Sequence, residues 1–253
     1  MKPRILAIVT TLNEMPSTTL QSIMTQTIEV SKTFIVVGTY KLYQALLDLS
    51  SDKVSVLFQR ADMTKPLGIR LARAINYALQ QVDLKEYDFV LKVDADIVLP
   101  NRFLEENCKL KAAYIGRAGS AMLIRVKPFL QVFGGRFAEV VAEDSYIGLM
   151  FLYKGFTIKN YACKPVLMPE SRKHHSFRYY YALGKEYYKL GYEPIHVIAS
   201  LRYGKMELFK AFGYFVALLN GTERYEFARF VAKLQTMRLL YGREKILRVY
   251  RYY

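Results

Sequence analysis

Short apolar runs that alternate with segments of helical periodicity most constrain how the first hundred residues can fold. Strands are predicted over 4–10, 33–37, 54–58 and 89–93, and helices over 16–25, 40–49 and 67–81. Apolar strands that alternate with helices are typical of a parallel sheet whose two faces are both covered. The sequence therefore predicts an α/β protein with a mostly parallel sheet flanked by helices.

Such sheets bind ligands at the carboxyl ends of their strands, where this chain places polar residues. Asn13-Glu14 follows the first predicted strand, Gly38-Thr39 the second and Asp94-Ala95-Asp96 the fourth. In extended backbone, side chains two residues apart point the same way, so Asp94 and Asp96 can converge on one ligand. Paired carboxylates suit a divalent cation held against phosphate, although two acids in a loop are more often simply solvated.

The middle of the chain adds a second pair of acids. A strand is predicted over 118–124, a turn over 133–137 and a helix over 143–154 that Gly155 ends. Glu143 and Asp144 fall in the first turn of that helix, where the helix dipole favours negative charge. Two interpretations stay open: an ordinary acidic helix start, or a carboxylate kept ionised at neutral pH to act as a general base.

The C-terminal third is helical in pattern, rich in aromatic residues and basic. Residues 171–253 hold 16 Lys/Arg against 6 Asp/Glu, in a chain of net charge +15, so we predict a division into 1–170 and 171–253. This excess suggests an anionic partner (nucleic acid, a phospholipid surface or a phosphorylated substrate), with a solvated basic face as the alternative. An amphipathic basic helix is predicted over 224–248.

The apolar segment 208–219 contains Lys210 and is shorter than the roughly 20 residues that span a bilayer. It predicts a core helix, a dimer face or a helix lying in the membrane plane. Cys108 and Cys163 form no Cys-x-x-Cys pair, and the apolar run at 5–10 is too short for a secretory leader. We therefore expect a cytoplasmic protein, with peripheral contact to the inner face of the membrane as a further expectation.

Five segments in order resemble the inverting GT-A glycosyltransferases of family 2, a group that includes dolichyl-phosphate mannose synthase and many polysaccharide-building enzymes. They are 9–14, 68–76, 93–100, 134–137 and the block with Glu143-Asp144 and Gly155-Phe156. The resemblance covers roughly residues 4–195. It implies a Rossmann-like, nucleotide-diphospho-sugar transferase fold, here followed by a C-terminal helical extension.

The resemblance also implies a site. Asp96 would bind Mn²⁺ or Mg²⁺, Asp94 would share the metal or hold the ribose, and His174 or His175 would add a ligand or a diphosphate contact. Asp144 would be the general base, with Glu143 beside it. Arg73 is a further candidate for the pyrophosphate. The expected nucleotide-sugar contacts are Thr10, Thr11, Leu12, Asn13, Glu14, Val37, Gly38, Arg70, Asp94 and Ala95.

The chain departs from the family pattern in places that bear on specificity. Thr10 replaces a usual proline, Leu12 a usual aromatic, and Gly38-Thr39 stands where the family carries an acid after strand two. The donor base therefore stays open. The Q-x-x-R-W motif of processive members is absent, and so is tryptophan, which favours transfer of a single sugar. The expected partners are a nucleotide-diphosphate sugar and a hydroxyl or phosphate acceptor, either a glycan or lipid-linked, and a homodimer is a further expectation.

Three other interpretations account for parts of the sequence. A sugar nucleotidyltransferase would need a glycine-rich loop after strand one, whereas residues 11–14 contain no glycine. A nucleic-acid-binding protein would use the charge of +15 and the tyrosines at 179–181, and steep salt dependence of oligonucleotide binding would favour it, but no recognition module is present. A catalytically degenerate GT-A domain is the third, because the acid after strand two is missing.

Overall fold

A computed structural model of the protein describes residues 2–116, 120–168 and 176–237. In these ranges the central sheet has the strand order β3-β2-β1-β4-β7-β6-β8. The strands are β1 (Ile5–Thr11), β2 (Lys32–Val37), β3 (Val54–Phe58), β4 (Phe89–Asp94), β6 (Tyr114–Gly116), β7 (Ala121–Arg125) and β8 (Ile158–Lys159). The first four run parallel, β7 runs antiparallel to both β4 and β6, and β8 is parallel to β6.

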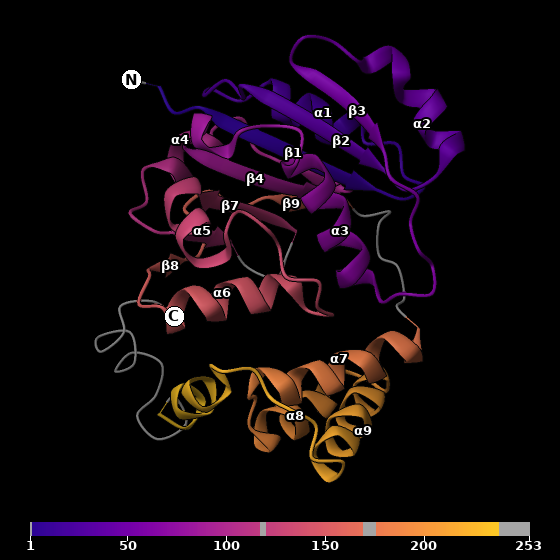
Figure 1. Ribbon diagram of the computed structural model, residues 1–253, viewed down its shortest axis with the longest axis vertical. Coiled ribbons are helices and arrows are strands. Elements are labelled where there is room, and N and C mark those ends of the chain that lie inside the picture. Colours follow the sequence, from indigo (N-terminus) through magenta and orange to yellow (C-terminus); the bar gives the residue numbers. More distant parts are fainter. Residues whose placement is uncertain (1, 117–119, 169–175, 238–253) are drawn as a thin grey trace.

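Helices cover both faces of this sheet, as the alternation of side chains along the strands predicts. Ile5, Ala7 and Val9 of β1 belong to the core shared with α1, α2 and α4, whereas Leu6 and Ile8 belong to the core shared with α3, α5 and α6. The helices are α1 (Ser17–Met24), α2 (Tyr40–Leu46), α3 (Leu67–Leu79), α4 (Phe103–Cys108), α5 (Val126–Phe133) and α6 (Glu143–Tyr153). The predicted fold class, a mostly parallel α/β sheet with a C-terminal helical part, is confirmed (Figure 1).

Several short elements were not predicted from the sequence. They are α4, α5, β6, β8 and the two-stranded pair of β5 (Ile97–Val98) with β9 (Val166–Leu167). The strands among them have two or three residues, too few to display an alternating pattern, and α4 and α5 span fewer than three helical turns. Several boundaries also differ from prediction by a few residues, for example at two places: the strand expected at 118–124 is found at Ala121–Arg125, and the basic helix begins at 228 rather than 224. Its predicted continuation past residue 237 lies outside the described ranges.

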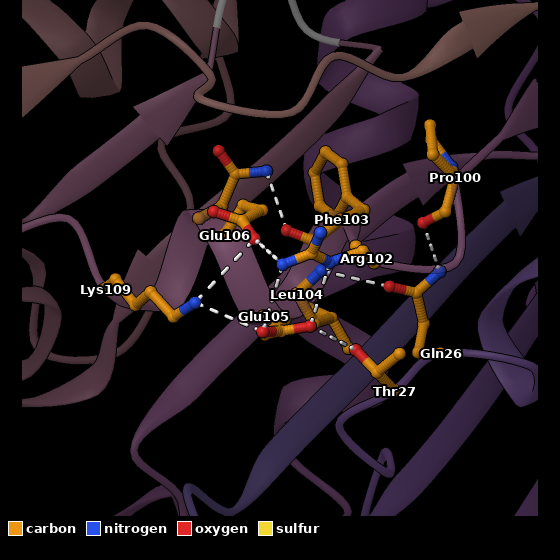
Figure 2. A network of polar contacts seen from close by, with 10 residues as sticks. Gln26, Thr27, Pro100, Arg102, Phe103, Leu104, Glu105, Glu106 and Lys109 are labelled. Carbon is orange, nitrogen blue, oxygen red and sulfur yellow. Dashed lines mark hydrogen bonds and ion pairs between the residues drawn. The ribbon is translucent and has the colours of Figure 1, made fainter.

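The segment that follows β4 is fastened to α1 and the turn after it by buried hydrogen bonds. Thr19 Oγ1 donates to the Ala95 carbonyl at 2.7 Å. Gln26 Nε2 donates to the Pro100 carbonyl at 2.9 Å, and Gln26 Oε1 accepts from the Leu104 amide at 3.0 Å (Figure 2). Because the Asp94-Ala95-Asp96 turn and the segment after it are held in this way, the two carboxylates have a defined backbone position.

The C-terminal helices α7 (Phe177–Leu190), α8 (Pro194–Ser200) and α9 (Met206–Leu219) lie at one end of the molecule (Figure 1). They join the rest through a core cluster in which Leu149 and Met150 of α6 pack with Leu190, Phe227 and Val231. No helix in the described part of the chain is long and apolar enough to cross a membrane. The division predicted between residues 170 and 171 falls outside the described ranges and stays a prediction.

Helices α7 and α9 approach each other so closely that their contact requires glycine. A Cβ atom on Gly184 would lie 1.8 Å from the Lys210 carbonyl oxygen, and one on Gly213 would lie 2.1 Å from the Tyr181 carbonyl oxygen. Backbone atoms cannot move aside as the end of a side chain can. The crossing of α7 and α9 therefore depends on two residues without side chains.

Gly184→Ala is expected to lower the free energy of unfolding by about 1–3 kcal/mol, because the added methyl group forces the two helices apart. Urea denaturation followed by circular dichroism would measure the change. The matched control is Gly148→Ala in α6, where the nearest atom to an added Cβ lies 4.0 Å away. The control should be neutral or stabilising because alanine favours helix over glycine. Equal effects of the two substitutions would contradict this account of the crossing.

Candidate functional site

A cavity of about 1180 Å³ lies at the carboxyl ends of β1 to β4. The strand order reverses there, since β2 and β3 lie on one side of β1 and β4 lies on the other. Ligands of open α/β sheets bind at this reversal point. Its lining residues come from the turns after these strands and from the first turns of α3 and α7: Thr10, Thr11, Leu12, Glu14, Gly38, Gln59, Arg60, Asp62, Lys65, Arg70, Arg73, Asp94, Ala95, Asp96, Arg178 and Tyr179, among others.

The turns after β1, β2 and β3 are joined through Gly38. The Gly38 amide donates to the Thr11 carbonyl at 2.9 Å, and the Gly38 carbonyl accepts from the Ala61 amide at 3.1 Å. A Cβ atom on Gly38 would lie 2.6 Å from Leu12 Cδ1. At the end of β2, where the family that the sequence resembles carries an acid, a side chain at position 38 would therefore require the Leu12 side chain to shift.

Three buried polar atoms of the cavity lining have no hydrogen-bond partner within the described residues: Thr10 Oγ1, Gln59 Oε1 and Arg70 Nε. Leaving such a group unsatisfied typically costs about 1–3 kcal/mol, so these three atoms are available to water or to a ligand that fills the cavity. That ligand must accept a hydrogen bond from the arginine and donate one to the amide oxygen. Arg73, in contrast, is occupied: its Nε donates to Glu139 Oε2 at 2.7 Å.

Gln59 is a site residue that the sequence reasoning missed. It follows β3 directly, at the same edge of the sheet as the three strand ends that were considered. The position after the third predicted strand was the available signal. Arg60, Asp62 and Lys65, in the same connection, line the cavity as well and were missed for the same reason.

Beneath the acidic turn, β4 carries a fully buried lysine. Lys92 is 1% exposed, and its Nζ lies 2.6 Å from Asp94 Oδ1. Burial lowers the pKa of Lys92, but the charges of Asp94 and Glu143 outweigh this and leave the pKa above its ordinary value. Lys92 is therefore a cation inside the protein, and it neutralises part of a cluster of carboxylates.

Glu143 behaves differently from the expectation for an acid in the first turn of a helix. Burial, with the charge of Asp144 as the second cause, raises the pKa of Glu143 to about 8, and the side chain is only 6% exposed. The expected ionised state at neutral pH is therefore wrong for Glu143, because desolvation outweighs the favourable helix end. Helix α3 seals this position: a Cβ atom on Gly68 would lie 2.5 Å from Glu143 Oε2.

Because Glu143 is mostly protonated in the folded protein at neutral pH, we expect the free energy of unfolding to fall as the pH rises. The group titrates near 4.5 in an unfolded chain and near 8 in the folded one, so the folded state binds more protons between these values. The free energy of unfolding should therefore decrease from about pH 5 to about pH 8. Glu143→Gln should flatten this part of the profile, as measured by urea denaturation across the range.

Glu223→Gln is the matched control for that experiment because Glu223 is exposed. It should keep the slope of the unsubstituted protein. A Glu143→Gln profile with the same slope as the unsubstituted protein would show that Glu143 is ionised in the folded state.

Asp144 is partly exposed, and its Oδ1 accepts a hydrogen bond from the Ser145 amide at 2.7 Å. Neither Asp144 nor Glu143 is among the described residues that line the cavity. They border it, however, because burial and then the charges of Glu143 and Asp144 raise the pKa of Tyr179, a lining residue at the start of α7. The acid pair of α6 therefore lies within electrostatic range of the cavity.

The structure brings most of the predicted nucleotide contacts together around this one cavity, along with the predicted metal ligand Asp96: Thr10, Thr11, Leu12, Glu14, Gly38, Arg70, Asp94 and Ala95. Two others are placed elsewhere. Val37 is fully buried in the hydrophobic core, and Asn13 is exposed outside the lining. His174 and His175 lie outside the described residues.

Within the described ranges no group of three His, Cys, Asp or Glu side chains is arranged to hold a metal ion by itself. Asp94 and Asp96 instead fit a cation that takes its remaining ligands from water and from a bound substrate. Mg²⁺ keeps several waters and binds through one or two carboxylates together with substrate phosphates. Asp96 and Asp94 offer these oxygen ligands at the cavity wall. Oδ1 of Asp94 already contacts Lys92.

No protein-family model matches the chain, and no curated protein matches it in sequence. Its structure is similar to TarS of S. aureus, with a TM-score of 0.51 and 14% identity over 98% of this chain and 54% of TarS. The chain thus spans about half the length of TarS. This likeness shows a shared GT-A-like fold.

Two further similarities are weaker. GlyE, a glycosyltransferase of Streptococcus pneumoniae TIGR4, gives a TM-score of 0.35 and 13% identity over 51% of this chain and 36% of GlyE. The 4-diphosphocytidyl-2C-methyl-D-erythritol synthase of Anaerococcus prevotii gives a TM-score of 0.46 and 10% identity over 67% of this chain and 95% of the synthase.

Proposed function

We propose that the protein is a glycosyltransferase that binds a nucleoside-diphosphate sugar in the cavity at the ends of β1 to β4 and transfers one sugar to a hydroxyl or phosphate acceptor. The observation that carries this proposal is the set of unpartnered buried atoms, Thr10 Oγ1, Gln59 Oε1 and Arg70 Nε, around a cavity that also holds Asp94 and Asp96. The cavity is at least as large as typical small-molecule sites, which measure about 300–1,000 Å³.

The charges of the lining suit a diphosphate. Arg60, Lys65, Arg70 and Arg178 supply guanidinium and ammonium groups, and α3 begins at Leu67 on the same wall. Guanidinium groups bind phosphate oxygens in a bidentate manner, and the start of a helix favours negative charge. The same wall carries Asp94 and Asp96, so a cation is needed before a diphosphate can approach them without repulsion.

In this proposal Asp96, with Asp94 beside it, holds a Mg²⁺ or Mn²⁺ ion. Such an ion would neutralise negative charge that develops on the departing diphosphate. Lys92 keeps Asp94 in place from inside the sheet through its 2.6 Å contact. Thr19, through the Ala95 carbonyl, holds the turn between the two aspartates. The protein thereby fixes both carboxylates before any ligand binds.

Asp144 is the proposed general base. It would take the proton of the acceptor hydroxyl as the acceptor oxygen attacks the anomeric carbon, on the side opposite to the leaving diphosphate. The bond from the anomeric carbon to the phosphate oxygen breaks, so the configuration at that carbon inverts. Burial keeps Glu143 mostly protonated at neutral pH, so we assign the role of base to its partly exposed neighbour.

The test is a panel of nucleoside-diphosphate sugars incubated with the protein and Mg²⁺ or Mn²⁺. A glycosyltransferase releases a nucleoside diphosphate from one member of the panel, faster when acceptor is present. A nucleotidyltransferase would instead release pyrophosphate from a nucleoside triphosphate and a sugar phosphate. Failure of every nucleotide to bind, together with salt-dependent binding of oligonucleotides, would overturn the proposal in favour of a nucleic-acid-binding protein.

Gln59→Ala should weaken binding of the accepted nucleotide by about 2–10-fold, the loss expected from one net hydrogen bond. Titration calorimetry with the nucleoside diphosphate measures the change. Gln81→Ala, at the exposed end of α3, is the matched control and should bind as the unsubstituted protein does. Equal affinity in Gln59→Ala and Gln81→Ala would show that the buried amide oxygen of Gln59 does not contact the nucleotide.

A further inference from the structure

Among the residues that the structure describes, helix α9 has apolar side chains on two faces, and one of these faces is covered. Ala211, Tyr214 and Ala217 are buried in a cluster with residues of α7 and α8. On the opposite side Leu208, Phe212 and Leu219 are 61%, 60% and 83% exposed. A helix with apolar residues on both faces is usually buried in a protein core or in a membrane. Exposure of the second face of α9 to water is therefore unfavourable.

Exposed apolar side chains are also present on the two elements that precede α9 and contact it. Val197 of α8 is buried in the same cluster as Tyr214, whereas Ile195 and Ile198 of the same helix are exposed. The short helix η4 (Leu201–Tyr203) packs against both α8 and α9. We call the exposed large apolar residues of these three elements the apical patch: Ile195, Ile198, Leu201, Tyr203, Leu208, Phe209, Phe212, Leu218 and Leu219.

The apical patch lies at the end of the molecule away from the sheet. Figure 1 shows α8 and α9 at the opposite end of the long axis from β1 to β3, with α7 between them and the sheet. Helix α7 connects the two regions, since Arg178 and Tyr179 in its first turn line the cavity. A surface that contacts α8 and α9 from this end would therefore not cover the sheet.

The charges around the patch identify its partner. Between residues 194 and 220 the exposed charged side chains are Arg202 and Lys205, both cationic. Glu207 is the acid of this segment, and it is mostly buried in an ion pair with Lys210. A solvent-facing apolar surface bordered by cations matches an anionic bilayer, which offers acyl chains below and negative head groups above.

From this arrangement we propose that α8, η4 and α9 form a docking surface for an anionic lipid bilayer, on which α9 lies in the plane of the interface. A second copy of the chain fits less well, because a symmetric contact would bring Arg202 and Lys205 of both copies together in a protein of net charge +15. The proposal concerns membrane attachment and does not depend on which group the cavity transfers.

Vesicle cosedimentation tests the proposal directly, with the full chain and no nucleotide. The unsubstituted protein should bind vesicles of phosphatidylcholine with one-third phosphatidylglycerol at least about 10-fold more tightly than vesicles of phosphatidylcholine alone. Phe212→Ser/Leu219→Ser should lose at least about 10-fold in affinity for the anionic vesicles. Arg202→Gln/Lys205→Gln should lose affinity and become less sensitive to salt.

The matched control is Met24→Ser/Leu49→Ser, which removes two exposed apolar side chains of the sheet region and should bind as the unsubstituted protein does. Circular dichroism of each variant shows that the fold is retained, as expected for exposed positions. Absence of vesicle binding, or equal losses in the control and in Phe212→Ser/Leu219→Ser, would overturn the proposal. A dimer in analytical ultracentrifugation that Phe212→Ser/Leu219→Ser dissociates would overturn it in favour of a second copy.

Discussion

Asp144→Asn is expected to lower the rate of sugar transfer by about 10²–10⁴-fold, the usual contribution of a general base, while the affinity for the donor nucleotide stays unchanged. Asparagine keeps the size of the side chain and its hydrogen bond to the Ser145 amide, but it cannot take a proton from the acceptor. Because Asp144 lies outside the cavity lining, its loss should leave nucleotide binding intact.

The measurements are the turnover rate with donor and acceptor and, separately, the nucleotide affinity in the presence of Mn²⁺. Asp48→Asn is the control, since Asp48 is exposed on the helical turn after α2. If Asp144→Asn transfers sugar at the rate of the unsubstituted protein, another group takes the proton and the assignment is wrong.

Asp96→Asn distinguishes the proposed metal ligand, Asp96, from the proposed general base, Asp144. It should abolish transfer as well, but it should also remove the dependence of nucleotide affinity on Mn²⁺, because Asp96 lines the cavity and supplies a charged oxygen ligand. Both variants should therefore lose turnover, whereas only Asp96→Asn should lose the metal-dependent part of nucleotide binding. Metal-dependent nucleotide binding that survives in Asp96→Asn would place the cation elsewhere.

The second large effect is expected for stability. Lys92→Met should lower the free energy of unfolding by about 1–3 kcal/mol, because it leaves Asp94, whose side chain is 32% exposed at the cavity, without its buried partner. Methionine fills a similar volume, so the loss reports on charge rather than on a cavity. Asp94, 2.6 Å from Lys92, is the group that loses its partner.

Urea denaturation near pH 7 measures this change, and Lys159→Met is the control because Lys159 is an exposed lysine on strand β8. The double variant Lys92→Met/Asp94→Asn should recover part of the loss, since it removes both charges, and the cycle gives the interaction between them. A Lys92→Met protein as stable as the control would show that the pair contributes no net stability.

The framework of the sheet was predictable because long elements carry their own periodicity. The strand at Val54–Phe58 was predicted with its observed bounds, and the helix started by Glu143 ends before Gly155, whose φ of 80° favours glycine. The acidic turn could be placed at the edge of the sheet because it follows such a strand. Elements such as β5, with two residues, carry no pattern of their own and gain order only from neighbours.

The site was predictable only in part. Residues at strand ends were found because the carboxyl edge of a parallel sheet collects them, and most of them do line one cavity. Gln59 was missed, although it follows β3. Lys92 was read as part of a strand, since nothing local distinguishes a lysine that neutralises a neighbouring carboxylate from one that reaches solvent. Its role depends on Asp94 and on the acids of α6.

The amino-acid sequence by itself determined the mostly parallel sheet and the positions of the acidic pairs at element ends, because these depend on backbone geometry and on side-chain periodicity over a few neighbouring residues. Only the tertiary structure decided the protonation of Glu143, the unpartnered atoms of Thr10, Gln59 and Arg70, the crowding at Gly38 and Gly184, and the exposed second face of α9. Desolvation, steric contact and exposure depend on which distant segments meet, and no local pattern records that.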